Sequence, residues 1–310
     1  MFIITGTIAY DHIMDFPGAF SDHILPEQIH KINLSFIVNK FERRRGGTAG
    51  NVSYSLNLLK TPHLLFSYAG KDFDVYKKAF KKLGIDLRGV KIDRKNYTST
   101  GFAMTDKSDN QIWGYFYGAS DKIPTLKLNT VANKNDLVLI GPSGTKGSMS
   151  FVKQCIKYNI PYMFDPGFIL TQINNKDLLI GVSNAKFLIG NDYEIDLIAS
   201  RIRDWEKLIK DKIIIKTLGR DGTEILEYGK KYKIKPALVK NPIDPTGAGD
   251  AWRSGFIAGL LRKFDIITCS QMGSVAASFA VETYGTQEHT YTLSEFKNRY
   301  RQTYKILLDL

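Results

Sequence analysis

The sequence has 310 residues, of which 43% are hydrophobic, so the chain can bury a large core, and its formal net charge is +12. Its lysines are scattered through the presumed helices rather than gathered on one face, which argues against nucleic-acid binding, and no apolar run approaches a membrane-spanning length. The cysteines, Cys155 and Cys269, are far apart in the sequence and indicate neither a disulfide framework nor a metal site, so we expect a cytoplasmic protein.

Short apolar runs rich in β-branched and aromatic residues alternate with amphipathic stretches along the chain. The runs that predict buried strands are 2–4, 64–68, 137–140, 162–164, 187–189 and 213–215. Helical periodicity lies between them, over 73–83, 151–158 and 193–199. This βαβα order predicts an α/β fold in one domain over residues 1–310, with a doubly wound, mostly parallel sheet flanked by helices.

Two segments, from about 11 to 45 and from about 98 to 117, interrupt this alternation. Within them, residues 32–38 and 100–105 alternate between apolar and polar positions, which is the period of a β-strand with one buried face. We therefore expect extra strands from both segments.

The most specific feature is the run DPTGAGD at residues 244–250, which leads into an apolar helical stretch. The first turn of a helix has free N–H groups and the positive end of the helix dipole, so it attracts phosphate. Gly247 and Gly249 remove Cβ atoms where a phosphate must approach closely. Asp250 would repel a phosphate, but it can accept the proton of a hydroxyl that attacks a phosphoryl group. The alternative is an ordinary helix start with an acidic first turn.

This run resembles the C-terminal signature of the PfkB/ribokinase family of carbohydrate and nucleoside kinases. The segment GGTAGNVS at 46–53 resembles the N-terminal glycine-rich signature of the same family. The sequence departs from that signature at Lys60, where the family usually has Gly or Ser, and we interpret Lys60 as a changed helix cap.

The resemblance implies a ribokinase-like fold in which the two interrupting segments form a small β-sheet lid over the substrate. It implies ATP and Mg²⁺ as cofactors, and a monovalent cation such as K⁺ activates some family members. By the same resemblance, Asp250 is the catalytic base, and the N–H groups of Gly247, Ala248 and Gly249 stabilise the transferred phosphoryl group.

Four further residues match positions where the family holds the sugar: Thr7, Asp11, Gly47 and Asn51. A carboxylate such as Asp11 can accept two hydroxyl protons at once, which orients a sugar as well as binding it. The structural alternatives are a turn aspartate that caps local backbone and, for Asn51, an ordinary helix-start residue.

Residues matching the family's nucleotide region follow the later strands. Asn191 and Glu194 resemble its Asn-x-x-Glu motif, in which we expect Glu194 to meet Mg²⁺ through water, although the pair can also form a capping box. The loop with Thr217, Gly219 and Gly222 resembles the family's nucleotide loop, although a plain strand-to-hairpin turn would also use these glycines.

Within the family, the run 282–288, Asp11-His12 and Pro26-Glu27 resemble the bacterial adenosine kinase branch. That resemblance places Ser35, Phe102 and Phe116 at lid positions that meet the nucleoside, with the two phenylalanines as a purine clamp. The alternative is that these phenylalanines form the lid's apolar face. After Asp165-Pro166, this chain has apolar residues where that branch places polar ones, so base recognition would depend on stacking.

We therefore expect an ATP-dependent kinase acting on a primary (5′) hydroxyl, with adenosine as the leading substrate. The alternatives are a sugar kinase of the ribokinase or fructokinase type and, less favoured, a silent ligand-binding protein on the same fold. Its small-molecule partners would be the nucleoside or sugar and ATP, and a strand-rich lid could also support a homodimer.

Overall fold

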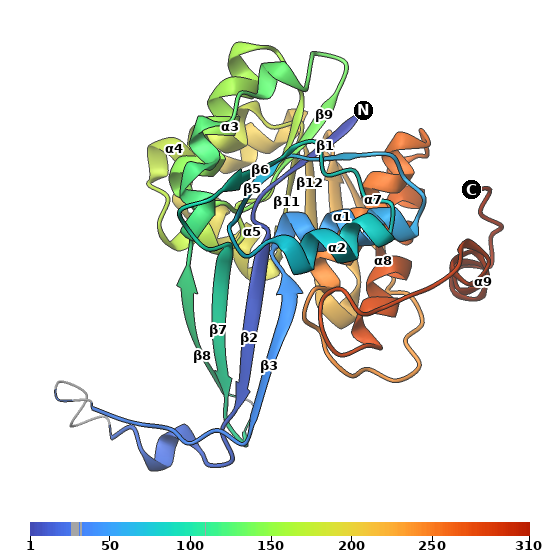
Figure 1. Ribbon diagram of the computed structural model, residues 1–310. Coiled ribbons are helices and arrows are strands. Elements are labelled where there is room, and N and C mark those ends of the chain that lie inside the picture. Colours follow the sequence, from blue (N-terminus) through green and yellow to red (C-terminus); the bar gives the residue numbers. More distant parts are fainter. Residues whose placement is uncertain (26–30, 32, 109) are drawn as a thin grey trace.

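The computed structural model describes residues 1–25, 31, 33–108 and 110–310 (Figure 1). Pro26 and Glu27, which contributed to the resemblance, lie outside these residues. The strands are β1 (Phe2–Thr5), β2 (Ala9–Asp15), β3 (Lys40–Gly46), β4 (Leu64–Leu65), β5 (Ser67–Gly70), β6 (Val90–Asp93), β7 (Ser99–Thr105), β8 (Gln111–Phe116), β9 (Leu137–Ile140), β10 (Tyr162–Phe164), β11 (Phe187–Asn191), β12 (Ile213–Thr217), β13 (Thr223–Glu227) and β14 (Lys230–Ile234).

The α-helices are α1 (Thr48–Leu58), α2 (Asp74–Lys82), α3 (Gly144–Lys157), α4 (Asn175–Asn184), α5 (Asp192–Arg201), α6 (Trp205–Leu208), α7 (Ala248–Leu261), α8 (Ile266–Val281) and α9 (Leu293–Tyr304). The described residues contain no helix with the length and apolarity needed to cross a bilayer.

The main sheet has the order β14-β13-β12-β11-β10-β9-β1-β4. It is parallel from β4 to β12, and β13 and β14 continue it as an antiparallel hairpin. Helices α1, α2, α7, α8 and α9 contribute to the hydrophobic core on one face, and α3, α4 and α5 contribute to the core on the other (Figure 1). The predicted α/β class, with a mostly parallel sheet flanked by helices and a separate small sheet, is confirmed by this arrangement.

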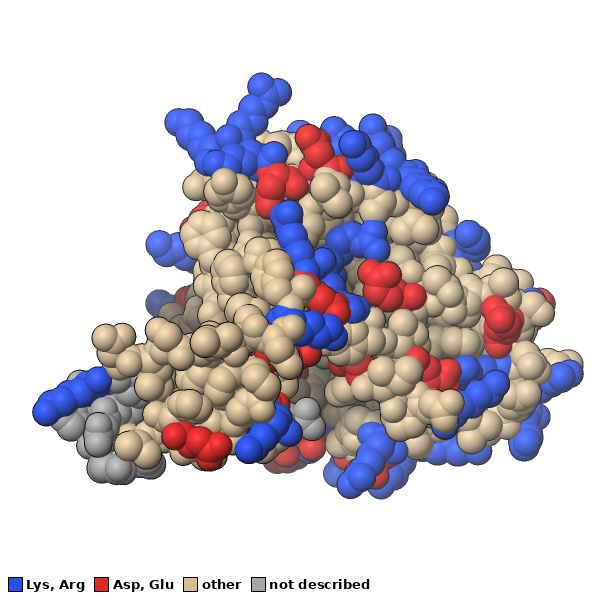
Figure 2. Space-filling model, turned by 60° about the horizontal axis from the view of Figure 1, so that its bottom comes forward, with Lys and Arg blue, Asp and Glu red and all other residues tan. Residues whose placement is uncertain are grey.

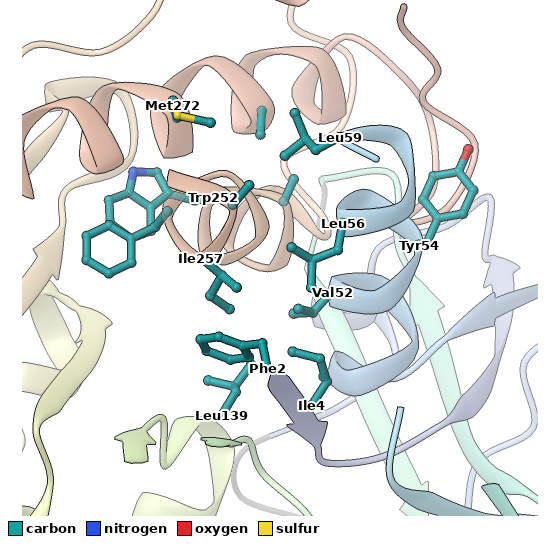
Figure 3. Close-up of a cluster of buried hydrophobic side chains, with 14 of the residues drawn as sticks. Phe2, Ile4, Val52, Tyr54, Leu56, Leu59, Leu139, Trp252, Ile257 and Met272 are labelled. Atoms are coloured by element: carbon teal, nitrogen blue, oxygen red, sulfur yellow. The ribbon is translucent and has the colours of Figure 1, made fainter. Parts of the chain in front are cut away.

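Helix α7, which follows the glycine-rich run, packs on strand β1 of the sheet and against the neighbouring helices α1 and α8. In Figure 3, Phe2 and Ile4 of strand β1 lie below Val52 of α1 and Ile257 of α7. Helices α7 and α8 pack so closely that a Cβ on Gly255 would lie 2.3 Å from the Met272 carbonyl oxygen. The start of α7 therefore has a defined position at the carboxyl edge of the sheet, where ligands bind in folds of this kind.

A separate four-stranded sheet, with the order β3-β2-β7-β8, extends from the body (Figure 1). We call this sheet the lid. Strands β2 and β3 are antiparallel, with Asp11 opposite Arg44, and β2 and β7 are parallel, with Asp11 opposite Gly101. Because side chains alternate along strands, this register decides which lid residues share a face with Asp11.

Two strand predictions need correction. Residues 64–68 form two short strands rather than one, because after the Phe66 N–H donates to the Ile4 carbonyl at 2.8 Å, the chain pairs with β6 in a different sheet. The described part of 32–38 contains no strand, because Phe36 packs against the rings of Phe16 and Phe20 at the lid tip.

The strand paired with β2 is instead the charged segment Lys40–Gly46. It lies at the edge of the lid, where charged side chains are well tolerated and discourage pairing with other chains.

The interpretation of Lys60 as a changed cap is confirmed. Lys60 follows α1 with a φ of 51°, in the left-handed region that glycine usually fills, and its N–H donates to the Asn57 carbonyl at 3.0 Å. Cys155 and Cys269 are both free and buried.

Candidate active site

The turn before α7 forms a cradle of backbone N–H groups. Asp244 fixes this turn, because its carboxylate accepts the Thr246 N–H and the Gly285 N–H, each at 2.9 Å. Gly247 has a φ of 80°, and a Cβ there would lie 3.0 Å from Thr286, so both conformation and space require glycine.

Helix α7 begins with donors that are free to bind an anion. The first helical hydrogen bond of α7 is donated by the Ala251 N–H to the Gly247 carbonyl at 2.9 Å. The N–H groups of Gly249 and Asp250 have no backbone acceptor among the described residues, whereas the Ala248 N–H donates to the Pro245 carbonyl at 3.1 Å. Gly249 and Asp250 are therefore better placed than Ala248 to bind an anion here.

Asp250 lies at this cradle and belongs to a buried chain of hydrogen bonds. The Asn51 amide donates to Asp250 at 2.8 Å, and the Gln287 amide donates to the Asn51 oxygen at 2.8 Å and to the Tyr76 hydroxyl at 2.6 Å. Tyr76 in turn donates to the Gly46 carbonyl at 3.0 Å. These contacts orient the Asp250 carboxylate, and burial raises its pKa to about 6, despite the opposing effects of Arg253 and Asn51.

Gln287 is a residue of this site that the sequence did not single out. It lies after α8 in the run 282–288, which contributed to the resemblance, but nothing in that run marks it as a neighbour of Asn51. The contact arises because α1 and this segment meet above the same edge of the sheet. Asn51, expected to hold the sugar, is thus also a support for Asp250.

A second carboxylate, Asp11, faces the cleft beneath the lid. It lies between two glycines, because a Cβ on Gly46 or on Gly101 would meet its carboxylate oxygens at 1.9 and 2.9 Å. No described residue donates a hydrogen bond to Asp11, and burial raises its pKa to about 6. The carboxylate is therefore desolvated and available to hydroxyl donors.

Thr7 and Gly47 lie next to Asp11 and have clear structural roles. The Thr7 carbonyl accepts the N–H groups of Ala49 and Gly50, at 3.0 and 3.4 Å, at the start of α1. A Cβ on Gly47 would lie 2.5 Å from the Ala9 backbone nitrogen, so only glycine allows β2 to pass this turn. Both residues shape the backbone around Asp11.

The cleft between the lid and the body has a volume of about 1060 Å³. Its lid side is lined by Asp11, Ile13, Ala103 and Trp113, and its body side by the turn at 243–246 and the segment 284–286. Figure 2 shows a hollow between the lid and the body, with Lys and Arg spread over the visible surface. The turn that precedes α7 and the Asp11 carboxylate thus line one cleft.

The register separates the predicted phenylalanine clamp from this cleft. Phe102 lies opposite His12 in β2, and Phe116 lies opposite Thr100 in β7. Both therefore occupy the face of the lid opposite to that of Asp11 and Trp113. Ser35 is exposed in the segment before β3 and does not line the cleft.

The inner face of the lid has aromatic side chains that the sequence analysis did not select. Trp113 packs over Gly101, where a Cβ would lie 3.0 Å from its ring, and Tyr115 lies opposite Gly101 in the register. Phe168, in the apolar segment after Asp165, has its ring centre 5.5 Å from that of Tyr115. These rings form a half-exposed aromatic surface next to Asp11.

The residues expected near the nucleotide follow β11 and β12. Asn191 and Glu194 form the capping box of α5, with bonds of 2.7 and 2.8 Å, so the structural alternative considered for them is present. Burial and the nearby Asp165 raise the pKa of Glu194. The Glu194 carboxylate is therefore close enough to Asp165 and Arg253 to interact with their charges.

The loop after β12 has one structural glycine and one open glycine. A Cβ on Gly222 would lie 2.1 Å from the Ile234 carbonyl oxygen, whereas a Cβ on Gly219 would meet nothing within 4 Å. The Thr217 hydroxyl donates to the Gly190 carbonyl at 3.3 Å. Gly219 thus leaves space beside the loop, while Gly222 is needed for the fold.

Three consecutive arginines of β3, at positions 43–45, contact residues of the body. Arg43 lies 2.9 Å from Asp72, Arg45 lies 3.2 Å from Glu288, and Arg44 donates to the Tyr284 carbonyl at 2.6 Å. These contacts join the edge of the lid to the body.

Comparison with known proteins agrees with this geometry. The chain is 28% identical over 307 residues to a nucleoside kinase of Methanothermobacter thermautotrophicus, covering 96% of this chain and 94% of the relative. Among solved structures, the Burkholderia thailandensis nucleoside kinase in complex with inosine superimposes with a TM-score of 0.90 at 27% identity, covering 99% of this chain and 100% of that one. The nucleoside kinase of Methanocaldococcus jannaschii, described as an archaeal member of the ribokinase family, gives 0.85 at 26% identity, with coverages of 97% and 98%.

The sequence profile of the pfkB family carbohydrate kinases matches residues 8–292, which include the lid, the α7 turn and the body segments around them. The chain therefore belongs to the pfkB family of carbohydrate kinases.

Proposed function

We propose that this protein transfers the γ-phosphoryl group of ATP to the 5′-hydroxyl of a nucleoside, with adenosine as the leading substrate. The observation that carries the proposal is that one cleft joins the α7 turn to Asp11, while Trp113 and Tyr115 line the lid beside Asp11. This set supplies a base, a phosphate site, hydroxyl acceptors and stacking surfaces. The nucleoside kinase relatives, one of them in complex with inosine, support a purine nucleoside.

In the proposed reaction, Asp250 accepts the proton of the 5′-hydroxyl as its oxygen attacks the γ-phosphorus. The N–H groups of Gly249 and Asp250 donate to the phosphoryl oxygens as charge develops on them, and Gly247 leaves room for close approach. Asp11 accepts hydrogen bonds from the ribose hydroxyls and so aligns the attacking oxygen. Gly219 and Thr217 border the space for the rest of the nucleotide.

The residues present fit Mg²⁺ that is brought with the nucleotide. Among the described residues, no group of three His, Cys, Asp or Glu side chains could hold a metal ion alone. Magnesium commonly keeps several waters and binds through phosphates and one or two carboxylates. Glu194 is the carboxylate that would meet such a water, and the metal would neutralise phosphate charge.

The function is tested by ATP-dependent phosphorylation of adenosine, guanosine, inosine, ribose and fructose with Mg²⁺. Turnover of adenosine above the other substrates is expected. Turnover of ribose or fructose alone would assign the chain to the sugar kinases, and binding without ATP consumption across the panel would show a silent ligand-binding protein.

We expect the base to stack on the inner face of the lid. Trp113→Ala and Tyr115→Ala should each raise the KM for adenosine roughly 5- to 150-fold, since stacking on an aromatic ring is worth about 1–3 kcal/mol per base. Phe102→Ala and Phe116→Ala, which truncate aromatic rings on the opposite face of the same strands, are the matched controls. If steady-state kinetics show the larger rise in KM for the two Phe variants, the result would instead support the predicted clamp of Phe102 and Phe116.

The outer face of the lid supports the expectation of a homodimer. Its apolar side chains Phe41, Phe102, Ile112 and Phe116 are 61, 43, 45 and 49% exposed. Such a patch is unusual on a monomer and often marks an interface. We expect sedimentation velocity to show a dimer that Phe102→Arg dissociates, and a wild-type monomer at all concentrations would contradict this.

A further inference from the structure

Arg253 is a buried cation one helical turn beyond Asp250 on α7, and it is only 8% exposed. Its guanidinium binds Asp165, which directly follows β10 and is 2% exposed. Nη2 donates to one carboxylate oxygen at 2.8 Å, and Nε lies 2.5 Å from the other. Nη2 makes the one hydrogen bond of this pair, and Nε is in ionic contact with the second oxygen without hydrogen-bond geometry. Contact through two of the three guanidinium nitrogens restricts the plane of the group.

The third nitrogen, Nη1, points to the start of the helix. A Cβ on Gly249 would lie only 2.8 Å from Nη1, and no described residue accepts a hydrogen bond from it. This direction follows from helix geometry, because side chains lean toward the N-terminus and residue 253 therefore covers residue 249. Nη1 thus lies beside the same turn as the free N–H groups of Gly249 and Asp250.

This position is unfavourable for a cation unless an anion binds there. The first turn of a helix carries the positive end of the dipole, and a buried ion pair has to overcome the desolvation of both charges. A stabilising role alone would be met more simply by two apolar side chains. A phosphoryl group at the turn would instead receive donors from the helix and from Nη1 together.

We propose that Arg253 is a catalytic residue that donates from Nη1 to the transferred phosphoryl group, and that Asp165 is its positioning residue. This inference rests on the proposed kinase function. As the 5′-oxygen bonds to the γ-phosphorus, the bond from phosphorus to the β,γ-bridging oxygen breaks, ADP leaves and Asp250 takes the hydroxyl proton. Arg253 keeps its proton throughout and neutralises charge on the phosphoryl oxygens.

The proposal is tested by removing the cation with and without its partner. Arg253→Met leaves a buried carboxylate unpaired and can unfold the chain, so it is compared with the charge-free double variant Arg253→Met/Asp165→Asn. Arg253→Lys keeps the positive charge but lacks the planar guanidinium that contacts Asp165 and the helix turn at the same time. Arg299→Met is the matched control. Arg299 lies on α9 and forms a comparably buried ion pair, with its Nη2 2.8 Å from the Glu282 carboxylate.

We expect the double variant to fold, to bind adenosine and ADP with less than a threefold change, and to lose roughly 10³- to 10⁵-fold in kcat, the range seen for an arginine that stabilises phosphoryl transfer. It should also lose tight binding of ADP with aluminium fluoride, which mimics the transferred group. Arg253→Lys should lose most of this activity too, whereas Arg299→Met should retain kcat.

The outcomes separate this inference from the function on which it rests. Wild-type turnover together with a double variant within threefold of wild type would overturn the role of Arg253 and leave the kinase function standing. Absence of wild-type turnover across the whole substrate panel would overturn both. Recovery of kcat in the double variant relative to Arg253→Met alone would show that the pair acts only in folding.

Discussion

Replacing Asp250 with asparagine is expected to lower kcat for adenosine by roughly 10²- to 10⁴-fold, the usual contribution of a general base. Asparagine has the same shape and can still accept the hydrogen bond from Asn51, which is 2.8 Å long in the wild type. The KM values for adenosine and ATP should therefore change little. Steady-state kinetics measure this effect, and Asp74→Asn, which neutralises an exposed first-turn aspartate of α2, is the control.

The pH dependence of kcat/KM provides a second test of the same base. Since burial raises the pKa of Asp250 to about 6 and of Asp11 to about 6, wild-type activity should fall as pH drops through this region. This fall in activity at low pH reflects the titration of both carboxylates. Its shape should therefore change in Asp250→Asn and also in Asp11→Asn. Full activity of Asp250→Asn at pH 8 would remove Asp250 as the base.

The same substitution should leave the protein at least as stable at pH 8. The pKa of Asp250 is raised from 3.8 to about 6 in the folded chain, so folding favours its protonated form. The contribution of Asp250 to the stability of the folded chain is therefore greatest below about pH 4 and is lost as pH rises through about 6. The Tm of the variant should equal or exceed that of the wild type at pH 8, and this advantage should shrink toward pH 4.

Replacing Asp11 with asparagine is expected to lower kcat/KM for adenosine by roughly 10- to 150-fold per hydroxyl bond lost, because a hydrogen bond to a charged group is worth about 1.5–3 kcal/mol. The variant keeps the shape between Gly46 and Gly101, so the backbone of the lid should not move.

Deoxynucleosides show whether Asp11 contacts the ribose directly. The wild type should discriminate strongly against 2′-deoxyadenosine and 3′-deoxyadenosine, because each leaves part of the buried carboxylate unpaired. Asp11→Asn should discriminate much less. Equal discrimination by both proteins would place the ribose hydroxyls elsewhere in the cleft.

Local sequence was sufficient for the parts of the site that depend on neighbours in the chain. The run at 244–250 predicted a glycine turn followed by a helix, and the structure has Gly247 in the left-handed region just before α7. Asn191 and Glu194 predicted a capping box, which begins α5. In both cases the geometry is set within four residues, so no distant contact has to be known.

Residues brought together from distant segments could not be found in this way. Gln287 supports Asn51 across 236 positions in the chain, and Arg253 pairs with Asp165 across 88. The segment 32–38 alternates like a strand, but its aromatic ring packs at the lid tip while the charged segment 40–46 pairs with β2. Burial and partner choice outweighed local strand propensity there.

The sequence by itself determined the α/β class, the glycine turn before α7 and the candidate base, because hydrophobic period, glycine positions and helix starts are local properties. Only the tertiary structure decided which face of the lid is turned to the cleft. Phe102, Trp113 and Phe116 are equally aromatic in the sequence, and a shift of one residue in register would exchange their faces. The pairing of Asp11 with Gly101 fixes that register and places Trp113 inside and both phenylalanines outside.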